Sequence, residues 1–293
     1  MPDEKSKNRP TVSIIGTGRL GTTLALSLAS RGYHIRSLVA RRANSARKTA
    51  TLLEEDVQVV AAKDVRSLNP ADVFLITVPD DQIANVAAEL THVGTRSKVT
   101  TALHTSGALS ADVLAPLSKN GWHTGSIHPL ASISDASSGE SALRGAFWSV
   151  EGDNVALRVG KTIVRDLNGK SFSIRSEDKP LYHAAAVMAS GNAVALFDVA
   201  LEMLAECGLT RDTARRILLP LIESTVRSLA TKDPAQALTG TFSRGDLETV
   251  KRHLAALKRD QLADALELYR ILGKRSLKLT KKHPQITQIL KSV

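Results

Sequence analysis

Residues 16–21 read Gly16-Thr17-Gly18-Arg19-Leu20-Gly21, directly after the apolar run Val12-Ser13-Ile14-Ile15 and before a stretch rich in leucine and alanine. This order predicts a strand, a glycine turn and a helix, the setting in which G-x-G-x-x-G is a dinucleotide-binding fingerprint. The first glycine permits the tight turn, the second lets the backbone approach a pyrophosphate, and the third lets helix and strand pack closely. A glycine-rich turn without a ligand is the alternative, but it leaves the agreement of strand, spacing and helix unexplained. The six residues are therefore predicted to bind a dinucleotide.

The end of the next predicted strand, residues 35–40, indicates which dinucleotide is bound. NAD-binding domains usually place an Asp or Glu about twenty residues past the fingerprint, where it bonds the ribose 2′-hydroxyl. This chain has Arg41, Arg42, Asn44 and Ser45 there, and no acid. Because a guanidinium is always charged and forks onto phosphate oxygens, it suits a 2′-phosphate. We therefore predict NADP(H) rather than NAD(H), with Arg41 and Arg42 as the clamp, helped by Arg19, Asn44 and Ser45; two solvated arginines are the alternative.

Length and composition restrict the class of protein. The chain has 293 residues, enough for two domains, and its hydrophobic content of 43% is ordinary for a soluble globular protein. A single cysteine, Cys207, excludes an internal disulfide and fits a reducing compartment. The first ten residues lack the apolar core of a signal peptide. The longest weakly polar stretch, residues 184–196, is too short to span a bilayer and predicts a buried helix. We expect a cytoplasmic protein without a membrane partner.

The net charge of +10 raises the question of nucleic-acid binding. Residues 274–293 contain six basic side chains and no acid, so the excess is concentrated at the C-terminal end. Neither interleaved aromatic residues nor a recognisable reading motif accompanies it. We therefore interpret this segment as a solvated helix end and rank a nucleic-acid partner last.

Strand and helix patterns alternate through the first half of the chain, which predicts an α/β domain with a doubly wound parallel sheet covered on both faces. An all-helical domain follows. The domains are predicted to span residues 10–176, the Rossmann domain, and 177–293, a domain for substrate binding and dimerisation. Candidate strands lie at residues 12–15, 35–40, 57–60, 73–77, 99–103, 125–127, 146–150 and 171–174, the last two at the far edge of the sheet; C-terminal helices are expected at 181–207, 212–229, 246–257 and 260–280.

Polar residues follow three predicted strands, on the rim where open parallel sheets bind their ligands. Val78-Pro79 follows the fourth strand and is predicted to lie at the cofactor ribose. His104-Thr105-Ser106-Gly107 follows the fifth strand, and His128-Pro129-Leu130 follows the sixth. A hydride moving onto a carbonyl or imine carbon leaves charge on oxygen or nitrogen, to which a histidine with a near-neutral pKa can donate. His104 and His128 are the candidates, with Ser106 as a hydrogen-bond partner; alternatively, each histidine bonds a backbone carbonyl and shapes its loop.

The predicted helical domain adds three candidates. His183 and Asn192 are nine residues apart, so on a straight helix their faces roughly coincide. An asparagine in an apolar helix needs a polar partner or faces a cleft, and we predict the cleft. Arg244, in a glycine-bounded loop, is a candidate for binding a substrate carboxylate, or it pairs with an acid at the domain contact. No metal site is predicted.

Six segments together resemble a known family: residues 14–21, Val78-Pro79-Asp80-Asp81, His104-Thr105-Ser106-Gly107, His128-Pro129-Leu130, Tyr182-His183-Ala184-Ala185 and Ser243-Arg244-Gly245-Asp246. It is a bacterial family of Rossmann-like proteins with a helical C-terminal domain of unknown function. It is similar to pyrroline-5-carboxylate reductase, ketopantoate reductase and prephenate dehydrogenase, with a helical domain like that of 6-phosphogluconate dehydrogenase. The resemblance implies NADP binding and a homodimer through the helical domain.

Related hydroxyisobutyrate-type dehydrogenases use a lysine and an asparagine on the long helix. Asn192 matches the asparagine, but residues 181–207 contain no lysine. His183 or a loop histidine is then expected to replace it.

We therefore predict an NADP-dependent oxidoreductase that transfers a hydride to or from a small carbonyl or imine substrate bound between the two domains. The alternative is a non-catalytic NADP-binding redox sensor or scaffold, in which the rim histidines are structural.

Overall fold

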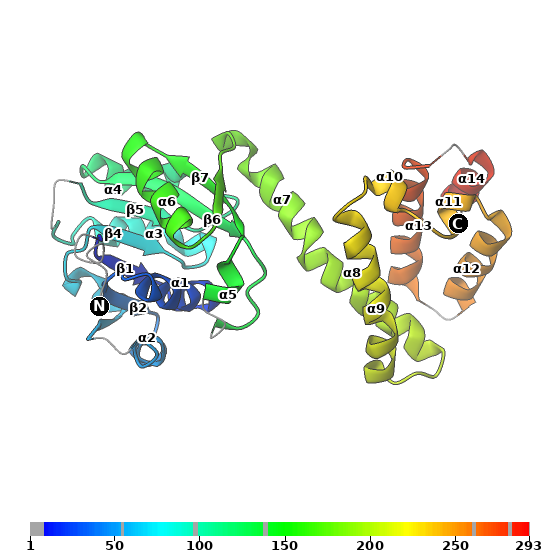
Figure 1. The fold of residues 1–293 in the computed structure, drawn as a ribbon, viewed down its shortest axis with the longest axis horizontal. Coiled ribbons are helices and arrows are strands. Elements are labelled where there is room, and N and C mark those ends of the chain that lie inside the picture. Colours follow the sequence, from blue (N-terminus) through cyan, green and yellow to red (C-terminus); the bar gives the residue numbers. More distant parts are fainter. Residues whose placement is uncertain are drawn as a thin grey trace. The chain divides into compact units, whose positions relative to one another are not determined.

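The computed structural model describes residues 9–53, 56–95, 99–136, 140–259, 262–280 and 283–292. The chain divides into two compact units, Met1–Ser190 and Gly191–Val293 (Figure 1). The first is an α/β unit and the second is helical, which confirms the predicted fold class.

An eight-stranded sheet forms the centre of the first unit, with the order β3-β2-β1-β4-β5-β6-β7-β8. The pairs from β3 across to β6 are parallel, as the alternation of strand and helix predicts. The order reverses between β1 and β4, and this switch point is where such sheets bind ligands. The strands are β1 (Val12–Ile15), β2 (Ile35–Ala40), β3 (Gln58–Ala61), β4 (Val73–Ile76), β5 (Thr101–His104), β6 (His123–Leu130), β7 (Phe147–Gly152) and β8 (Lys170–Phe172).

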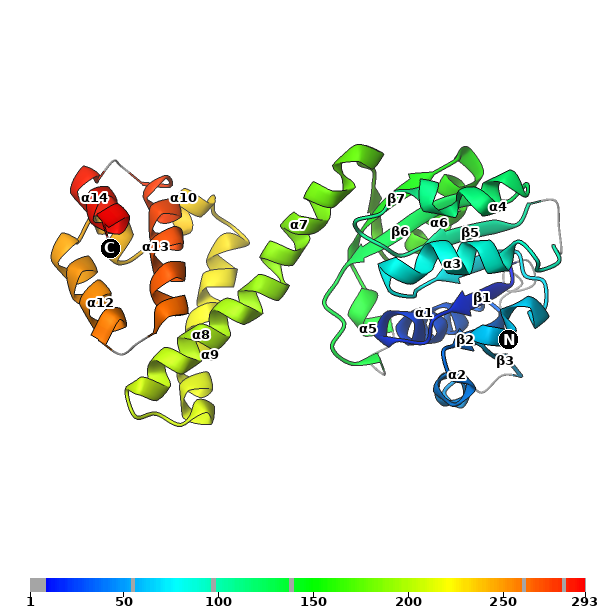
Figure 2. The ribbon, with the colours of Figure 1, turned by 180° about the vertical axis from the view of Figure 1, so that it is seen from behind.

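Helices cover both faces of this sheet (Figures 1 and 2). Alternate strand residues point to opposite faces, so Leu75 joins one apolar core and Ile76 the other. The first core also receives side chains from α1 (Arg19–Ser30), α2 (Ala43–Ala50), α5 (Glu140–Leu143) and α6 (Asn154–Asp166). The second receives them from η2 (Ala62–Ser67), α3 (Asp80–Leu90), η3 (Ala111–Leu114) and α4 (Ala115–Lys119).

The far edge of the sheet departs from a wholly parallel arrangement. Strands β7 and β8 lie there, as predicted, and pair in parallel with each other, but β7 runs antiparallel to β6. Strand β6 extends to Leu130 and pairs with all of β7, from Phe147 to Gly152. The chain thus turns back beside β6 instead of crossing over, which only an antiparallel pair allows without a crossover helix.

The predicted boundary at 176/177 precedes the division found in the structure, which follows Ser190. Helix α7 (Lys179–Ala189) starts on the sheet, because the ammonium of its first residue, Lys179, is buried against β6 and β7. The predicted single helix over 181–207 is two helices, α7 and α8 (Gly191–Glu206), since Ser190 leaves the helical conformation at φ −122° and ψ −78°. A Ser-Gly pair is a common place for such a break.

The second unit consists of helices. Its small core contains Val250, Leu254, Leu277, Ile286 and Leu290. Asp246 accepts a hydrogen bond from the amide of Thr249, as expected of a residue that caps a helix. Residues 260 and 261 of the predicted helix over 260–280 lie outside the described residues, and the last helix of the unit was not predicted. The helices after α8 are α9 (Arg211–Leu229), α10 (Pro234–Ala237), α11 (Thr241–Arg244), α12 (Leu247–Arg259), α13 (Ala263–Leu277) and α14 (Pro284–Ser292); a short 3-10 turn, η5 (Ser176–Asp178), precedes α7.

The stretch 184–196 is not buried as predicted. Val194 is 70% exposed and Met188 is 65% exposed, because few side chains of this chain cover α7 and the start of α8. Among the described residues, one helical stretch, Ser176–Glu206, is long and apolar enough to cross a membrane, with a mean hydropathy of 1.6. Length and composition alone are weak support for a membrane span, and the buried Lys179 ties the start of this stretch to the sheet.

Candidate functional site

The glycine turn after β1 is tightly built on one side and open on the other. Gly16 has a φ of +111°, and a Cβ there would lie 2.7 Å from the carbonyl oxygen of Thr77. A Cβ on Gly21 would overlap the carbonyl oxygen of Gly16. Around Gly18, by contrast, a Cβ would meet nothing within 4 Å. Two glycines are therefore required by packing inside the chain, and the third leaves space for something outside it.

The start of α1 fits an anion. Gly18 caps the helix without a side-chain hydrogen bond, and its first turn contains no acid. The hydroxyl oxygen of Thr17 is buried and has no partner among the described residues. Free amides at a helix N-terminus, together with the helix dipole, favour a phosphate. These features fit the pyrophosphate of a dinucleotide held by the backbone of residues 16–21, with Arg19 and Leu20 beside it.

The end of β2 places two cations on the same rim. Arg41 and Arg42 are exposed, and neither side chain has an ion-pair or hydrogen-bond partner among the residues that the structure describes. Both precede α2, whose first turn also lacks an acid. Ser45 is exposed in that turn, while the side chain of Asn44 accepts a bond from Arg47. The residue types fit the negative charge of a 2′-phosphate, and the choice of NADP stays a prediction.

The loops after β4 and β5 are joined by one hydrogen bond. Ser106 donates its hydroxyl to Asp80 at 2.8 Å and accepts bonds from the amides of Ala108 and Leu109. Val78 packs against the second core, and the exposed Pro79 is the N-cap of α3. Ser106 thus orders the rim next to the switch point, and the cofactor contacts of Val78 and Pro79 stay predictions.

His104 belongs to the framework of this rim. Its Nδ1 accepts the amide of Ser106, and its Nε2 lies 3.1 Å from the carbonyl oxygen of Ser110. The ring is fully buried, and burial, followed by the charge of Lys179, lowers its pKa to about 4. Because Nε2 must donate to the carbonyl, the ring is neutral and both nitrogens are used. The structure therefore supports the loop-shaping interpretation of His104 over proton donation.

His128 and His183 meet at the pocket. Their rings are 5.3 Å apart and edge to face, and both pack against Gly107, where a Cβ would lie 2.9 Å from Nε2 of His128. Burial, His183 and Lys179 lower the pKa of His128 to about 4. Nδ1 of His183 is buried and has no partner among the described residues. With Arg19, Leu20, Asp80 and Ser106, the two histidines line a pocket of about 270 Å³.

Lys179 is the residue that the sequence analysis missed. Its side chain is fully buried, and Nζ donates to Ser126 at 2.7 Å and lies 3.3 Å from the carboxylate of Glu151. Burial lowers the pKa of Lys179, whereas the nearby Glu151 raises it. Glu151 also accepts bonds from the amide of Ala111 and the hydroxyl of Ser176, and its pKa is lowered despite partial burial. A lysine beside Glu177-Asp178 and Pro180 has the pattern of an exposed linker, so no sequence signal distinguishes it.

Two of the predicted site residues lie in the helical unit. Asn192 is exposed in the first turn of α8, and Arg244 is exposed at the end of α11, before Gly245. Their predicted roles toward a substrate stay predictions. Among the described residues, no group of three His, Cys, Asp or Glu side chains is arranged to hold a metal ion.

The fold and the open glycine turn define a Rossmann-like protein with a helical C-terminal domain. Residues 1–129 match the Rossmann-like domain family, and residues 146–276 match a domain of unknown function, DUF2520. The chain thus combines these two domains. No curated protein matches the sequence.

Solved structures share this fold. A candidate NADP oxidoreductase from Bacteroides fragilis is 23% identical, with a TM-score of 0.76 over 92% of this chain and 98% of its own. A protein from Thermotoga maritima is 25% identical, with a TM-score of 0.71 over 92% and 98%. A reductive aminase from Aspergillus terreus, in complex with NADPH and ethyl-5-oxohexanoate, is 14% identical, with a TM-score of 0.65 over 97% and 99%. Pyrroline-5-carboxylate reductase from Coxiella burnetii and prephenate dehydrogenase from Aquifex aeolicus also share the fold, as the resemblance predicted; similarity to ketopantoate reductase stays a prediction.

Proposed function

We propose that this chain is an NADP(H)-dependent oxidoreductase acting on a small carbonyl or imine compound. One observation carries the proposal: Arg19 and Leu20 of the glycine turn line the same pocket as Ser106, His128 and His183. A dinucleotide whose pyrophosphate rests on α1 would therefore extend toward two imidazoles. When bound, the nicotinamide would supply or accept the hydride. Fold relatives described as an NADP oxidoreductase and as an NADPH-bound reductive aminase support this assignment.

Other residues, in the pocket and outside it, are assigned the remaining roles. Arg41 and Arg42 would hold the 2′-phosphate, and the backbone of residues 16–21 would hold the pyrophosphate. Ser106 orients the rim through Asp80. His128 and His183 offer polar atoms to the substrate oxygen or nitrogen, where charge develops during hydride transfer. Arg244 and Asn192 remain proposed contributions of the helical domain, Arg244 toward an anionic group.

Titration with NADPH and NADH, followed by nicotinamide fluorescence, tests cofactor binding. We expect quenching or a blue shift, with NADPH bound more tightly than NADH. Oxidation of NADPH in the presence of 2-oxo acids, small ketones and cyclic imines then tests catalysis. Tight NADPH binding without turnover on any compound would favour the non-catalytic sensor, and no binding of either nucleotide would refute the proposal.

The exposed apolar helices support the proposed homodimer. On α9 alone, Leu221 is 64% exposed and Val226 is 61% exposed, and Val194 adds a third such side chain on α8. Large exposed apolar side chains on two helices that pack together are typical of a protein–protein contact in soluble proteins. Light scattering after gel filtration is expected to show a dimer, and Leu221→Glu is expected to give monomers. Ser118→Glu, an exposed substitution on α4, is the matched control; a wild-type monomer would contradict this part of the proposal.

A further inference from the structure

The hydroxyl of Tyr182 contacts one nitrogen of the His128 ring. The phenolic oxygen lies 2.8 Å from Nδ1, and the two rings meet edge to face with centroids 5.6 Å apart. Phe172 of β8 also packs edge to face with Tyr182, with centroids 5.8 Å apart. Tyr182 follows the anchored Lys179 by three residues, so it stands one turn further along α7. Two strands of the sheet, β6 and β8, thus contact the tyrosine ring.

The chemistry of the two groups decides which one donates. His128 is buried in part, and the charges on neighbouring elements are Lys179 of α7 and Asp80 of α3, with His183 and His104 as further titratable groups. Burial, His183 and Lys179 together lower the pKa of His128 well below neutrality, so the ring is neutral at pH 7. A phenol proton is more acidic than the N–H of a neutral imidazole. The hydroxyl therefore donates to the Nδ1 lone pair.

This bond determines what the other nitrogen presents. A neutral imidazole has one protonated and one bare nitrogen, and the second partner of the ring sets which is which. With Nδ1 accepting from Tyr182, the ring hydrogen is on Nε2. Nε2 lies on the side of Gly107 and His183, which line the pocket.

We infer that Tyr182 is a positioning residue that holds His128 in the Nε2–H tautomer, so that His128 presents a hydrogen-bond donor to the pocket. What this tautomer means for the substrate rests on the proposed function. A donor at Nε2 pairs with an acceptor atom, such as a carbonyl oxygen or the lone pair of a neutral imine nitrogen. A protonated iminium has no such lone pair and would find no acceptor at Nε2. At Nε2, His128 thus favours the uncharged form of the substrate.

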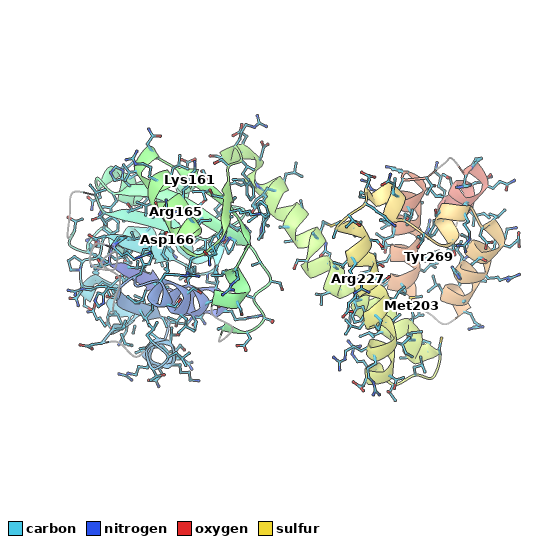
Figure 3. The ribbon with its side chains drawn as sticks, viewed as in Figure 1. Lys161, Arg165, Asp166, Met203, Arg227 and Tyr269 are labelled. Atoms are coloured by element: carbon cyan, nitrogen blue, oxygen red, sulfur yellow. The ribbon has the colours of Figure 1, made fainter. Side chains whose placement is uncertain are left out.

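The structure also contains a matched control pair. Tyr269, which is labelled in Figure 3, lies in the helical unit. Its hydroxyl lies 2.8 Å from Nδ1 of His253, and those rings are also 5.6 Å apart, at 87°. His253 is exposed and does not line the pocket described above. Tyr269→Phe therefore removes the same bond away from the pocket.

Nitrogen-15 NMR of the histidine rings at pH 7 tests the inference without cofactor or substrate. Wild-type protein is expected to show protonated Nε2 and bare Nδ1 at His128, assigned through the loss of its signals in His128→Gln. Tyr182→Phe is expected to give a mixture of both tautomers, whereas Tyr269→Phe leaves His128 unchanged. Protonated Nδ1 in the wild type, or an unchanged tautomer in a folded Tyr182→Phe variant, would overturn the inference.

A second readout separates this inference from the proposed function. Affinity for NADPH is expected to stay within about twofold in Tyr182→Phe, because the tyrosine does not line the glycine turn. On any compound that is turned over, kcat is expected to fall more than tenfold in Tyr182→Phe and to remain unchanged in Tyr269→Phe; equal rates in wild type and Tyr182→Phe would refute the positioning role. If NADPH does not bind to wild type, the proposed function fails while the tautomer result stands by itself.

Discussion

Alanine at Gly18 is expected to weaken cofactor binding with little change in stability, whereas alanine at Gly21 is expected to destabilise the fold. Gly18 has extended backbone at φ −74° and ψ −171°, which any residue adopts, and an added Cβ meets no atom within 4 Å. Gly18→Ala should therefore change the free energy of unfolding by less than about 1 kcal/mol. Alanine lowers the conformational entropy of the unfolded chain, and this gain offsets the weaker helix cap. Gly21→Ala pushes a Cβ into the carbonyl oxygen of Gly16 and should destabilise the fold by about 2 kcal/mol or more.

Gly18→Ala should lower the affinity for the cofactor although it leaves the stability nearly unchanged. If the methyl group of Gly18→Ala keeps a pyrophosphate from two backbone amides, about 3 kcal/mol of charge-assisted hydrogen bonding is lost, which is roughly a hundredfold in Kd. Urea unfolding gives the stability, and fluorescence titration with NADPH gives the affinity. Gly18→Ala protein that binds NADPH as tightly as wild type would show that the turn does not receive the pyrophosphate.

Three further outcomes follow from the charges of the site. Replacing Arg41 and Arg42 with alanine should weaken NADPH binding roughly 10- to 100-fold and leave NADH nearly unchanged, since only NADPH has the 2′-phosphate; equal losses for both nucleotides would contradict the clamp. The folded pKa values of His104 and His128 are both about 4, below an unfolded value of about 6.5, so the unfolded chain takes up protons first as pH falls. The free energy of unfolding should therefore be retained above pH 6.5 and decline between pH 6.5 and 4, by up to about 3 kcal/mol for each histidine, and urea unfolding of His104→Gln should show a shallower decline. Lys179→Met leaves its carboxylate partner uncompensated and should cost about 3 kcal/mol in the same measurement, whereas a loss below about 1 kcal/mol would mean that the buried ion pair contributes little.

The sequence predicted those parts of the molecule that local patterns determine. Apolar runs and the glycine hexamer predicted the strands, the first helix and the turn, because backbone conformation and packing there depend on neighbouring residues. The histidines after β5 and β6 were found from their place at strand ends, since parallel strands bring their carboxyl ends to one rim.

Other features depend on contacts that no local pattern records. Whether His104 or His128 faces the pocket depends on which carbonyl, amide or hydroxyl meets each ring from distant segments. Lys179 is buried because Ser126 and Glu151, on two other strands, receive its ammonium. The exposure of the apolar stretch 184–196 could not be foreseen either, because composition alone does not tell a helix buried by its own chain from one left uncovered.

The antiparallel pairing of β6 and β7 determines where the chain can be cut into fragments that fold separately. The match to DUF2520 begins at residue 146, immediately before β7, although β7 and β8 complete the sheet of the first unit. A fragment starting at residue 146 would contain two strands without their neighbours, and the complementary fragment would end with β6 as a bare edge prone to aggregation. Recombinant halves cut at that point should therefore be insoluble.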